Sequence, residues 1–246
     1  MAALAVSHLS KAYGGVQALR DVSFSVGAGE RVALIGPNGA GKTTCFNVLN
    51  GQLTPDSGEV RLYGASLLGM ASHAIARLGV GRTFQVAALF GSMSVRENVQ
   101  VALLAHHRRE RSFLVPARRS YAGEADRLLD TVGLRGQAER ACALLPYGEL
   151  KRLELAVALA QAPRVLLMDE PTAGMAPAER SALMALASQL ARSENIAVLF
   201  TEHDMDVVFG FASRILVLHL GELIAEGEPH AVRNDARVRA VYLGDA

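Results

Sequence analysis

The sequence has almost no excess of charge, few cysteines and no long apolar run. Its 246 residues include 25 Lys and Arg against 24 Asp and Glu, which gives a formal net charge of +1. Because the chain lacks a large excess of positive charge, nucleic acid is not expected as a main partner. The two cysteines, Cys45 and Cys142, lie far apart and lack metal-ligand spacing. They are expected to be small apolar residues of a protein in a reducing compartment.

Membrane and export signals are also missing from the sequence. No uncharged run of about 18 apolar residues occurs, so no membrane-spanning helix is expected. The first residues lack the basic cluster that begins a signal peptide. No internal repeat or linker divides the chain, and the composition is that of a globular protein. We therefore expect a single domain over residues 1–246.

The spacing of apolar residues predicts an α/β fold. Short runs that are almost wholly apolar predict buried parallel strands at residues 31–36, 164–171 and 196–204. Further strands, partly of alternating pattern, are predicted at residues 4–13, 22–26 and 57–64, with a hairpin turn at Leu220 and Gly221. Helices are predicted at residues 41–53, 95–107, 122–134, 149–163, 178–194 and 206–212.

The middle of the chain differs from both ends because its pattern is helical. We therefore expect a helical insert of about residues 90–155 within the α/β domain. Residues 108–121 of this insert are basic and contain one proline. They form either a solvated loop or an electrostatic contact with a partner or with anionic lipid headgroups.

A phosphate-binding motif follows the first buried strand. Residues 36–43 match G-x-x-x-x-G-K-S/T, with an apolar strand before the motif and a predicted helix after it. Glycines let backbone N–H groups turn inward around an anion, and the helix N-terminus adds positive potential. Lys42 is expected to reach the β- and γ-phosphates of ATP, and the Thr43 hydroxyl to bind Mg²⁺. The expected nucleotide ligands in this motif are Gly36, Pro37, Asn38, Gly39, Ala40, Gly41, Lys42, Thr43 and Thr44.

Two acidic residues end the second buried strand. Asp169 is expected at the edge of the sheet, where its carboxylate can hold Mg²⁺ directly or through water. Glu170 follows it, and strand alternation predicts that its side chain points elsewhere. A second carboxylate in this place can accept a proton from an attacking water molecule.

Three further positions complete a pattern that covers nearly the whole chain. They are Tyr13 before the first hairpin turn, Gln85 in residues 82–85, and His203 after the third buried strand. Together with the phosphate and acidic motifs, they resemble the ATP-binding subunit of an ABC transporter. The resemblance implies a P-loop NTPase core with an antiparallel β subdomain and an inserted α-helical subdomain. It also implies that Tyr13 stacks on adenine, Gln85 contacts Mg²⁺ and water, and His203 lies near the γ-phosphate.

The signature segment of that family departs from its usual form. It normally reads Leu-Ser-Gly-Gly-Gln, and here it reads Leu145, Pro146, Tyr147, Gly148 and Glu149. In the family this segment faces the ATP of a partner subunit. Pro146 has neither the hydroxyl nor the N–H that would contact the γ-phosphate. Ala176 likewise replaces a carboxylate that helps to couple the two ATP sites. We therefore expect a heterodimer with a second, related ATPase rather than a homodimer.

Other short motifs are similar to one group within the family, the ATP-binding subunits of branched-chain amino-acid importers and their relatives for urea or other amides. The resemblance implies an ATPase at the cytoplasmic face of a bacterial-type inner membrane. The implied partners are membrane-spanning permease subunits and an extracytoplasmic solute-binding protein, with ATP and Mg²⁺ as cofactors. Two alternatives stay open, a soluble ABC ATPase that acts outside transport and a nucleotide-binding subunit with poor hydrolysis.

Overall fold

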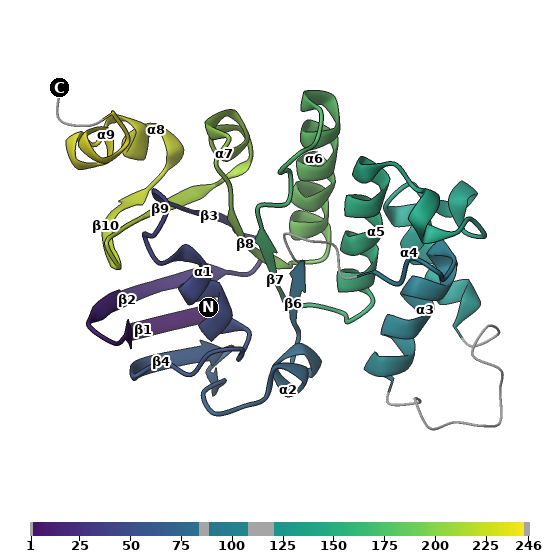
Figure 1. Cartoon of the computed structure of the whole chain (residues 1–246), viewed down its shortest axis with the longest axis horizontal. Helices are drawn as coiled ribbons and strands as arrows, with labels where there is room; N and C mark the ends of the chain where they lie inside the picture. Colours follow the sequence, from purple (N-terminus) through teal and green to yellow (C-terminus); the bar gives the residue numbers. More distant parts are fainter. Residues whose placement is uncertain (1, 84–88, 108–120, 244–246) are drawn as a thin grey trace.

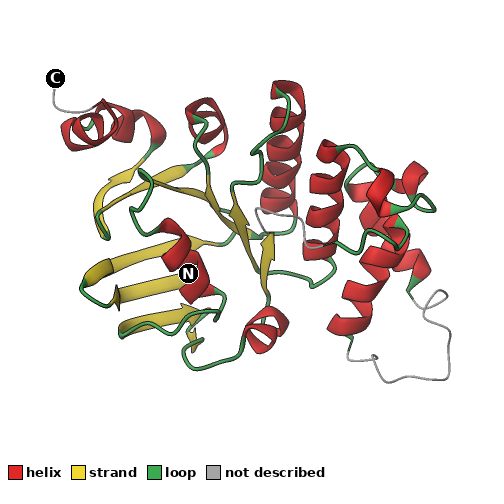
Figure 2. Cartoon of the chain, in the orientation of Figure 1, coloured by secondary structure: helices red, strands yellow, loops and turns green. Residues whose placement is uncertain are grey.

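The computed structural model describes residues 2–83, 89–107 and 121–243 and arranges them as two sheets beside a group of helices (Figure 1). The strands gather on one side of the molecule, and helices α3 (Val95–His106), α4 (Ala122–Thr131) and α5 (Tyr147–Leu159) lie on the other (Figure 2). The predicted α/β architecture is confirmed. Among the described segments, no helix has both the length and the apolarity needed to cross a membrane.

The smaller sheet is antiparallel and contains four strands in the order β2-β1-β4-β5. Its strands are β1 (Ala2–Tyr13), β2 (Val16–Gly27), β4 (Ser57–Leu62) and β5 (Ala65–Ser66). In β2, buried and exposed residues alternate from Val22 to Val26, as a sheet with one solvent-facing side requires. The strands predicted at residues 4–13, 22–26 and 57–64 are thereby confirmed.

The larger sheet has six strands in the order β10-β9-β3-β8-β7-β6. Its strands are β3 (Arg31–Ile35), β6 (Val80–Thr83), β7 (Val165–Asp169), β8 (Ala197–Thr201), β9 (Arg214–His219) and β10 (Glu222–Gly227). Strands β9, β3, β8, β7 and β6 pair in parallel, and β10 pairs antiparallel with β9. The carboxyl ends of the parallel strands therefore share one edge, where ligands of open α/β sheets bind.

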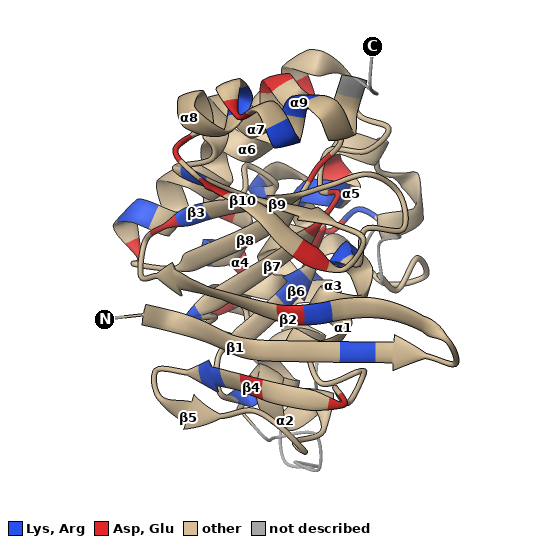
Figure 3. Cartoon of the chain, turned by 90° about the vertical axis from the view of Figure 1, so that its left-hand side faces the viewer, with Lys and Arg blue, Asp and Glu red and all other residues tan. Residues whose placement is uncertain are grey.

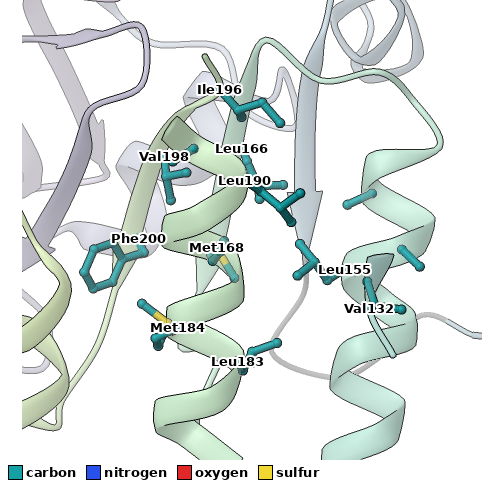
Figure 4. Close-up of a cluster of buried hydrophobic side chains, with 14 of the residues drawn as sticks. Val132, Leu155, Leu166, Met168, Leu183, Met184, Leu190, Ile196, Val198 and Phe200 are labelled. Carbon is teal, nitrogen blue, oxygen red and sulfur yellow. The ribbon is translucent and has the colours of Figure 1, made fainter. Parts of the chain in front are cut away.

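Buried side chains on both faces of the six-stranded sheet explain why its central strands are apolar throughout. Val32 and Leu34 of β3 belong to a core shared with the antiparallel sheet. Ala33 and Ile35 belong to a second core, on the opposite face of the strand. Figure 4 shows part of this second core between the sheet and two of the helices. Alternate residues of one strand thus serve two cores, so no polar face is left.

The helices pack around the sheets, and α3, α4 and α5 lie together beside them (Figure 1). They are α1 (Lys42–Leu49), α2 (Ser72–Arg77), α3 (Val95–His106), α4 (Ala122–Thr131), α5 (Tyr147–Leu159), α6 (Pro177–Ser193), α7 (Met205–Phe211), α8 (Pro229–Asn234) and α9 (Ala236–Leu243), with short 3-10 turns at Arg135–Gln137 and Cys142–Leu144. Helix α3 begins with a capping box, in which Ser94 and Glu97 bind each other's backbone N–H groups. The six predicted helices are confirmed.

The elements α2, β5, β6, α8 and α9 were not predicted. Each has eight residues or fewer, and β6 contains a glycine and Arg82, so none shows a clear hydrophobic period. The predicted hairpin turn is confirmed, since Leu220 and Gly221 both have positive φ, 47° and 84°. Cys45 and Cys142 are both buried, as expected, and burial raises the pKa of the Cys45 thiol to about 12.

Candidate nucleotide-binding site

The glycine-rich loop joins the end of β3 to the first residue of α1. Packing around the loop excludes side chains at two of its glycines. A Cβ atom at Gly36 would lie 2.1 Å from the carbonyl oxygen of Leu218, and one at Gly41 would lie 2.3 Å from that of Ala18. Gly41 also has a φ of 106°, which favours glycine. The backbone of β2 and β9 therefore packs closely against the loop and leaves no room for a side chain at Gly36 or Gly41.

Lys42 points back into this loop. Its ammonium nitrogen donates to the carbonyl oxygens of Gly36 at 2.6 Å and Pro37 at 3.1 Å. Burial lowers the pKa of Lys42, and the charges of Glu170 and Asp169 raise it in part. The structure thus encloses a cation within the loop, as recognition of a phosphate group requires. Thr43 is exposed on the first turn of α1, and Thr44 is partly buried beside it.

The Asp169 carboxylate lies at the carboxyl end of β7 and is held from two sides. Its Oδ1 accepts a hydrogen bond from Thr201 Oγ1 at 2.8 Å, and its Oδ2 pairs with Arg82 Nη2 at 3.1 Å. Arg82 also donates to the Asn47 side chain of α1 at 2.8 Å. Arg82 was not among the predicted site residues, although its place three residues before Gln85 is a signal for it. Arg82 links β6, β7 and α1 at the edge of the sheet.

Glu170 follows Asp169 but lies outside the strand. Its φ of 47° is left-handed, and its N–H donates to Thr201 Oγ1 at 3.0 Å. The carboxylate contacts the His203 ring, with 2.8 Å between Oε1 and Nε2. The side chains of Asp169 and Glu170 therefore have different partners because the backbone turns at Glu170. The expectation that strand alternation separates these two side chains was wrong. Left-handed backbone at a non-glycine residue is strained and is common at functional sites.

A buried glutamate that the sequence analysis missed ties the neighbouring loops together. Glu202 is 4% exposed, and its Oε1 accepts hydrogen bonds from the Thr172 N–H at 2.8 Å and the Thr172 hydroxyl at 2.7 Å. Thr172 lies just after Glu170, and Glu202 lies just before His203. The bond therefore connects the two loops that carry the Glu170–His203 contact.

The other predicted site residues lie apart from this cluster or outside the described residues. Tyr13 ends β1 with 50% of its surface exposed, and the Lys11 ammonium lies 5.9 Å from its ring centroid. Gln85 and most of the basic segment 108–121 belong to the undescribed ranges.

In the phosphate loop, Asn38 and Gly39 are exposed, Pro37 is partly buried and Ala40 is buried.

The signature segment caps helix α5 on the far side of β6 and β7 from α1 in Figure 1. Leu145 is buried, Pro146 is the N-cap residue, and Tyr147 is 45% exposed. A Cβ atom at Gly148 would lie 2.5 Å from a carboxylate oxygen of Glu179. Glu149 Oε2 is buried, and no group among the described residues donates a hydrogen bond to it.

Comparisons with known proteins agree with this geometry. The sequence profile of the ABC transporter family matches residues 19–173. A second profile, that of the branched-chain amino acid ATP-binding cassette transporter, matches residues 222–246.

The chain is 40% identical over 253 residues to the high-affinity branched-chain amino acid transport ATP-binding protein BraF of Pseudomonas aeruginosa. It is 41% identical over 253 residues to LivG of Salmonella typhimurium, which has the same description. Both alignments cover 99% of this chain and 98% of the relative. The lipopolysaccharide export system ATP-binding protein LptB of Acidithiobacillus ferridurans is 37% identical over 242 residues, which cover 98% of this chain and 97% of LptB.

Solved structures show the same fold. A nucleotide-free ATP-binding cassette from an ABC transporter aligns over 100% of both chains with a TM-score of 0.88 and 28% identity. A cassette in its ADP conformation also aligns over 100% of both chains, with a TM-score of 0.89 and 29% identity. The phosphate loop, the acidic strand end and these similarities agree, and the chain belongs to the ABC transporter family of ATP-binding, ATP-hydrolysing cassettes.

Proposed function

We propose that this chain is the ATP-hydrolysing subunit of an importer for branched-chain amino acids or a related amide or amino-acid solute. The observation that carries the solute class is the similarity to BraF and LivG over almost their whole length. The separate match at residues 222–246 supports the same class. LptB shares slightly less identity, so an export role has weaker support.

The phosphate loop and Lys42 would bind ATP. Backbone N–H groups of residues 38–44 and the N-terminus of α1 would face the phosphates, and the Lys42 ammonium would exchange its carbonyl partners for phosphate oxygens. The ring of Tyr13 would stack on the adenine.

The donor set near α1 fits a magnesium ion. The Thr43 hydroxyl and the Asp169 carboxylate are the hard oxygen donors that Mg²⁺ prefers, with Gln85 as a further expected ligand. When bound, the ion would neutralise charge on the phosphates. Asp169 is already oriented by Thr201 and Arg82, so its carboxylate needs little rearrangement to serve as a ligand.

Glu170 would act as the general base for hydrolysis. It would accept a proton from the attacking water, and His203 would orient that carboxylate through the 2.8 Å contact. Gln85 would complete the catalytic group. The Glu202–Thr172 bond would hold the two loops in register during the reaction.

The signature segment of residues 145–149 would act on the ATP of a second subunit. It lies far from α1 of its own chain, and the Glu149 oxygen has no hydrogen-bond donor among the described residues. Because Pro146 lacks a hydroxyl, we favour a related, non-identical ATPase as the second subunit. The expected assembly adds permease subunits and an extracytoplasmic solute-binding protein, with this chain bound peripherally at the cytoplasmic face of the membrane.

The test is purification of this chain with the permease and ATPase subunits encoded beside it, followed by reconstitution into vesicles. ATP-dependent uptake of leucine, isoleucine or valine in the presence of the binding protein supports the proposal. Uptake of none of these, or of a solute unrelated to amino acids and amides, rejects the solute class.

A further inference from the structure

A pocket borders the phosphate loop on the side of the last three helices. It has a volume of about 450 Å³ and lies among α7, α8, α9 and the end of β3. Its apolar lining comes from Ile35, Met205, Phe209, Val232 and Val238. Small-molecule sites commonly have volumes of about 300–1,000 Å³ and an apolar lining of this kind. Ile35 directly precedes Gly36, so the pocket adjoins the phosphate loop without belonging to it.

The pocket carries positive charge that no described carboxylate neutralises. Arg233 of α8 and Arg239 of α9 line it, and none of its lining residues is acidic. The Arg233 guanidinium lies 5.4 Å from the ring centroid of Phe209. The neighbouring carboxylate, that of Asp235, pairs instead with Arg237 at 2.8 Å. Figure 3 shows Lys or Arg positions on α9, at the top of the molecule.

Tyr242 of α9 and Ile35 both line the pocket, so the last helix lies beside the end of β3 that leads into the phosphate loop. Burial raises the pKa of the Tyr242 hydroxyl to about 12, and a contact with the backbone of Gly36 lowers it in part. The hydroxyl is therefore protonated at neutral pH. Gly36 is also the residue whose carbonyl oxygen accepts from Lys42. One tyrosine thus joins the last helix to the loop that would bind ATP.

We propose that this pocket binds a small carboxylate with a short aliphatic chain, and that Tyr242 transmits its occupancy to the phosphate loop. A guanidinium binds a carboxylate through two parallel hydrogen bonds, which makes arginine suited to this ligand. The aliphatic chain would lie on the apolar lining. A free amino acid fits less well, because its ammonium group would meet two guanidinium groups and no carboxylate in the lining.

Calorimetric titration of the full chain with 4-methylpentanoate tests the binding without any need for ATP. Acetate measures the carboxylate alone, and leucine adds an ammonium group to the same carbon skeleton. We expect 4-methylpentanoate to bind more tightly than either. Arg239→Gln and Arg233→Gln should each weaken binding about tenfold, the effect of losing one charge-assisted hydrogen bond.

Arg237→Gln is the matched control, because Arg237 lies on the same helix and pairs with Asp235 outside the pocket. This variant should bind 4-methylpentanoate like the unaltered chain. Absence of binding in the millimolar range overturns the proposal. Equal binding of leucine, or equal loss in the control variant, also overturns it.

A second measurement tests the transmission to the phosphate loop. The affinity for a fluorescent ATP analogue is measured with and without saturating 4-methylpentanoate, and a shift of at least twofold is expected. Tyr242→Phe should keep the carboxylate affinity and abolish the shift. A shift that persists in Tyr242→Phe, or no shift in the unaltered chain, refutes the role of Tyr242.

Discussion

The phosphate-loop face and the signature face of this cassette are built differently. On the first, Lys42, Asp169 and Glu170 all have partners within the chain, from carbonyl groups to Arg82 and His203. On the second, Pro146 offers no donor, and the Glu149 oxygen has no donor among the described groups. The charged groups of the first face are therefore held by its own chain, whereas the second face has the polar gaps that the proposed second subunit would fill.

Glycines on the two faces show the same difference. A side chain at Gly41 would meet the Ala18 carbonyl at 2.3 Å, and that backbone cannot move freely. A side chain at Gly148 would meet the Glu179 carboxylate at 2.5 Å, but this is the end of a flexible side chain. The phosphate loop is thus fixed by tertiary packing, and the signature segment keeps some freedom to adjust.

The largest effect is expected from Lys42→Ala. Removing the enclosed ammonium takes away the charge that offsets the β- and γ-phosphates, so ATP binding should be lost. Equilibrium dialysis with ATP measures it. Affinity equal to that of the unaltered chain would remove the phosphate loop from the proposed site.

Glu170→Gln should slow hydrolysis in the assembled complex by roughly 10²–10⁴-fold and leave ATP binding intact, because only the base is lost. Single-turnover measurements separate the rate of hydrolysis from the affinity for ATP. His203→Gln is the companion variant and should reduce the rate less, since His203 orients the carboxylate in the proposed mechanism. Unchanged turnover in Glu170→Gln assigns the base to another group.

Gly41→Ala and Gly148→Ala compare the two faces directly. Gly41→Ala should destabilise the chain by about 2–5 kcal/mol, from a strained φ and a clash with fixed backbone. Gly148→Ala should cost about 1 kcal/mol or less, because the Glu179 side chain can rotate away. Urea unfolding measures both, and equal losses would contradict the contrast between the faces.

Tyr13→Ala should weaken ATP binding by about 1–3 kcal/mol, the usual range for stacking of a base on an aromatic ring. Tyr13→Phe should be nearly silent, because the face of the ring makes the contact. Isothermal titration compares the two variants, and a large loss in Tyr13→Phe would point to the hydroxyl instead.

Pro146→Ser tests the signature face by restoring a hydroxyl group to it. The restored hydroxyl should favour ATP-dependent self-association of this chain by about 1.5–3 kcal/mol, the typical gain from a hydrogen bond to a charged group. Light scattering with ATP in a Glu170→Gln background measures it, and the parent chain should remain largely monomeric with low ATPase activity. A tight homodimer of the parent chain would show that its signature face is not deficient.

Most of the structural features that could be predicted lie in contiguous motifs. Buried strands, the phosphate loop and the Leu220–Gly221 turn depend on residues that are neighbours in the chain, so their spacing alone predicts the backbone they adopt. The short elements α2 and β6 escaped prediction, because four to six residues with a mixed composition show no period. Tertiary pairing with β7 stabilises β6 in spite of its sequence.

The α/β class, the family and the residues that follow each buried strand can therefore be read from the sequence alone, because these depend on local pattern. The contacts between side chains that are distant in the sequence depend instead on the tertiary fold. Arg82 reaches Asp169 from 87 positions away, and Glu202 reaches Thr172 from 30. Such contacts depend on strand order and on packing between layers, which no local pattern encodes. The pairing of Glu170 with His203 has the same origin, since β7 and β8 are neighbours in the sheet and end at the same edge.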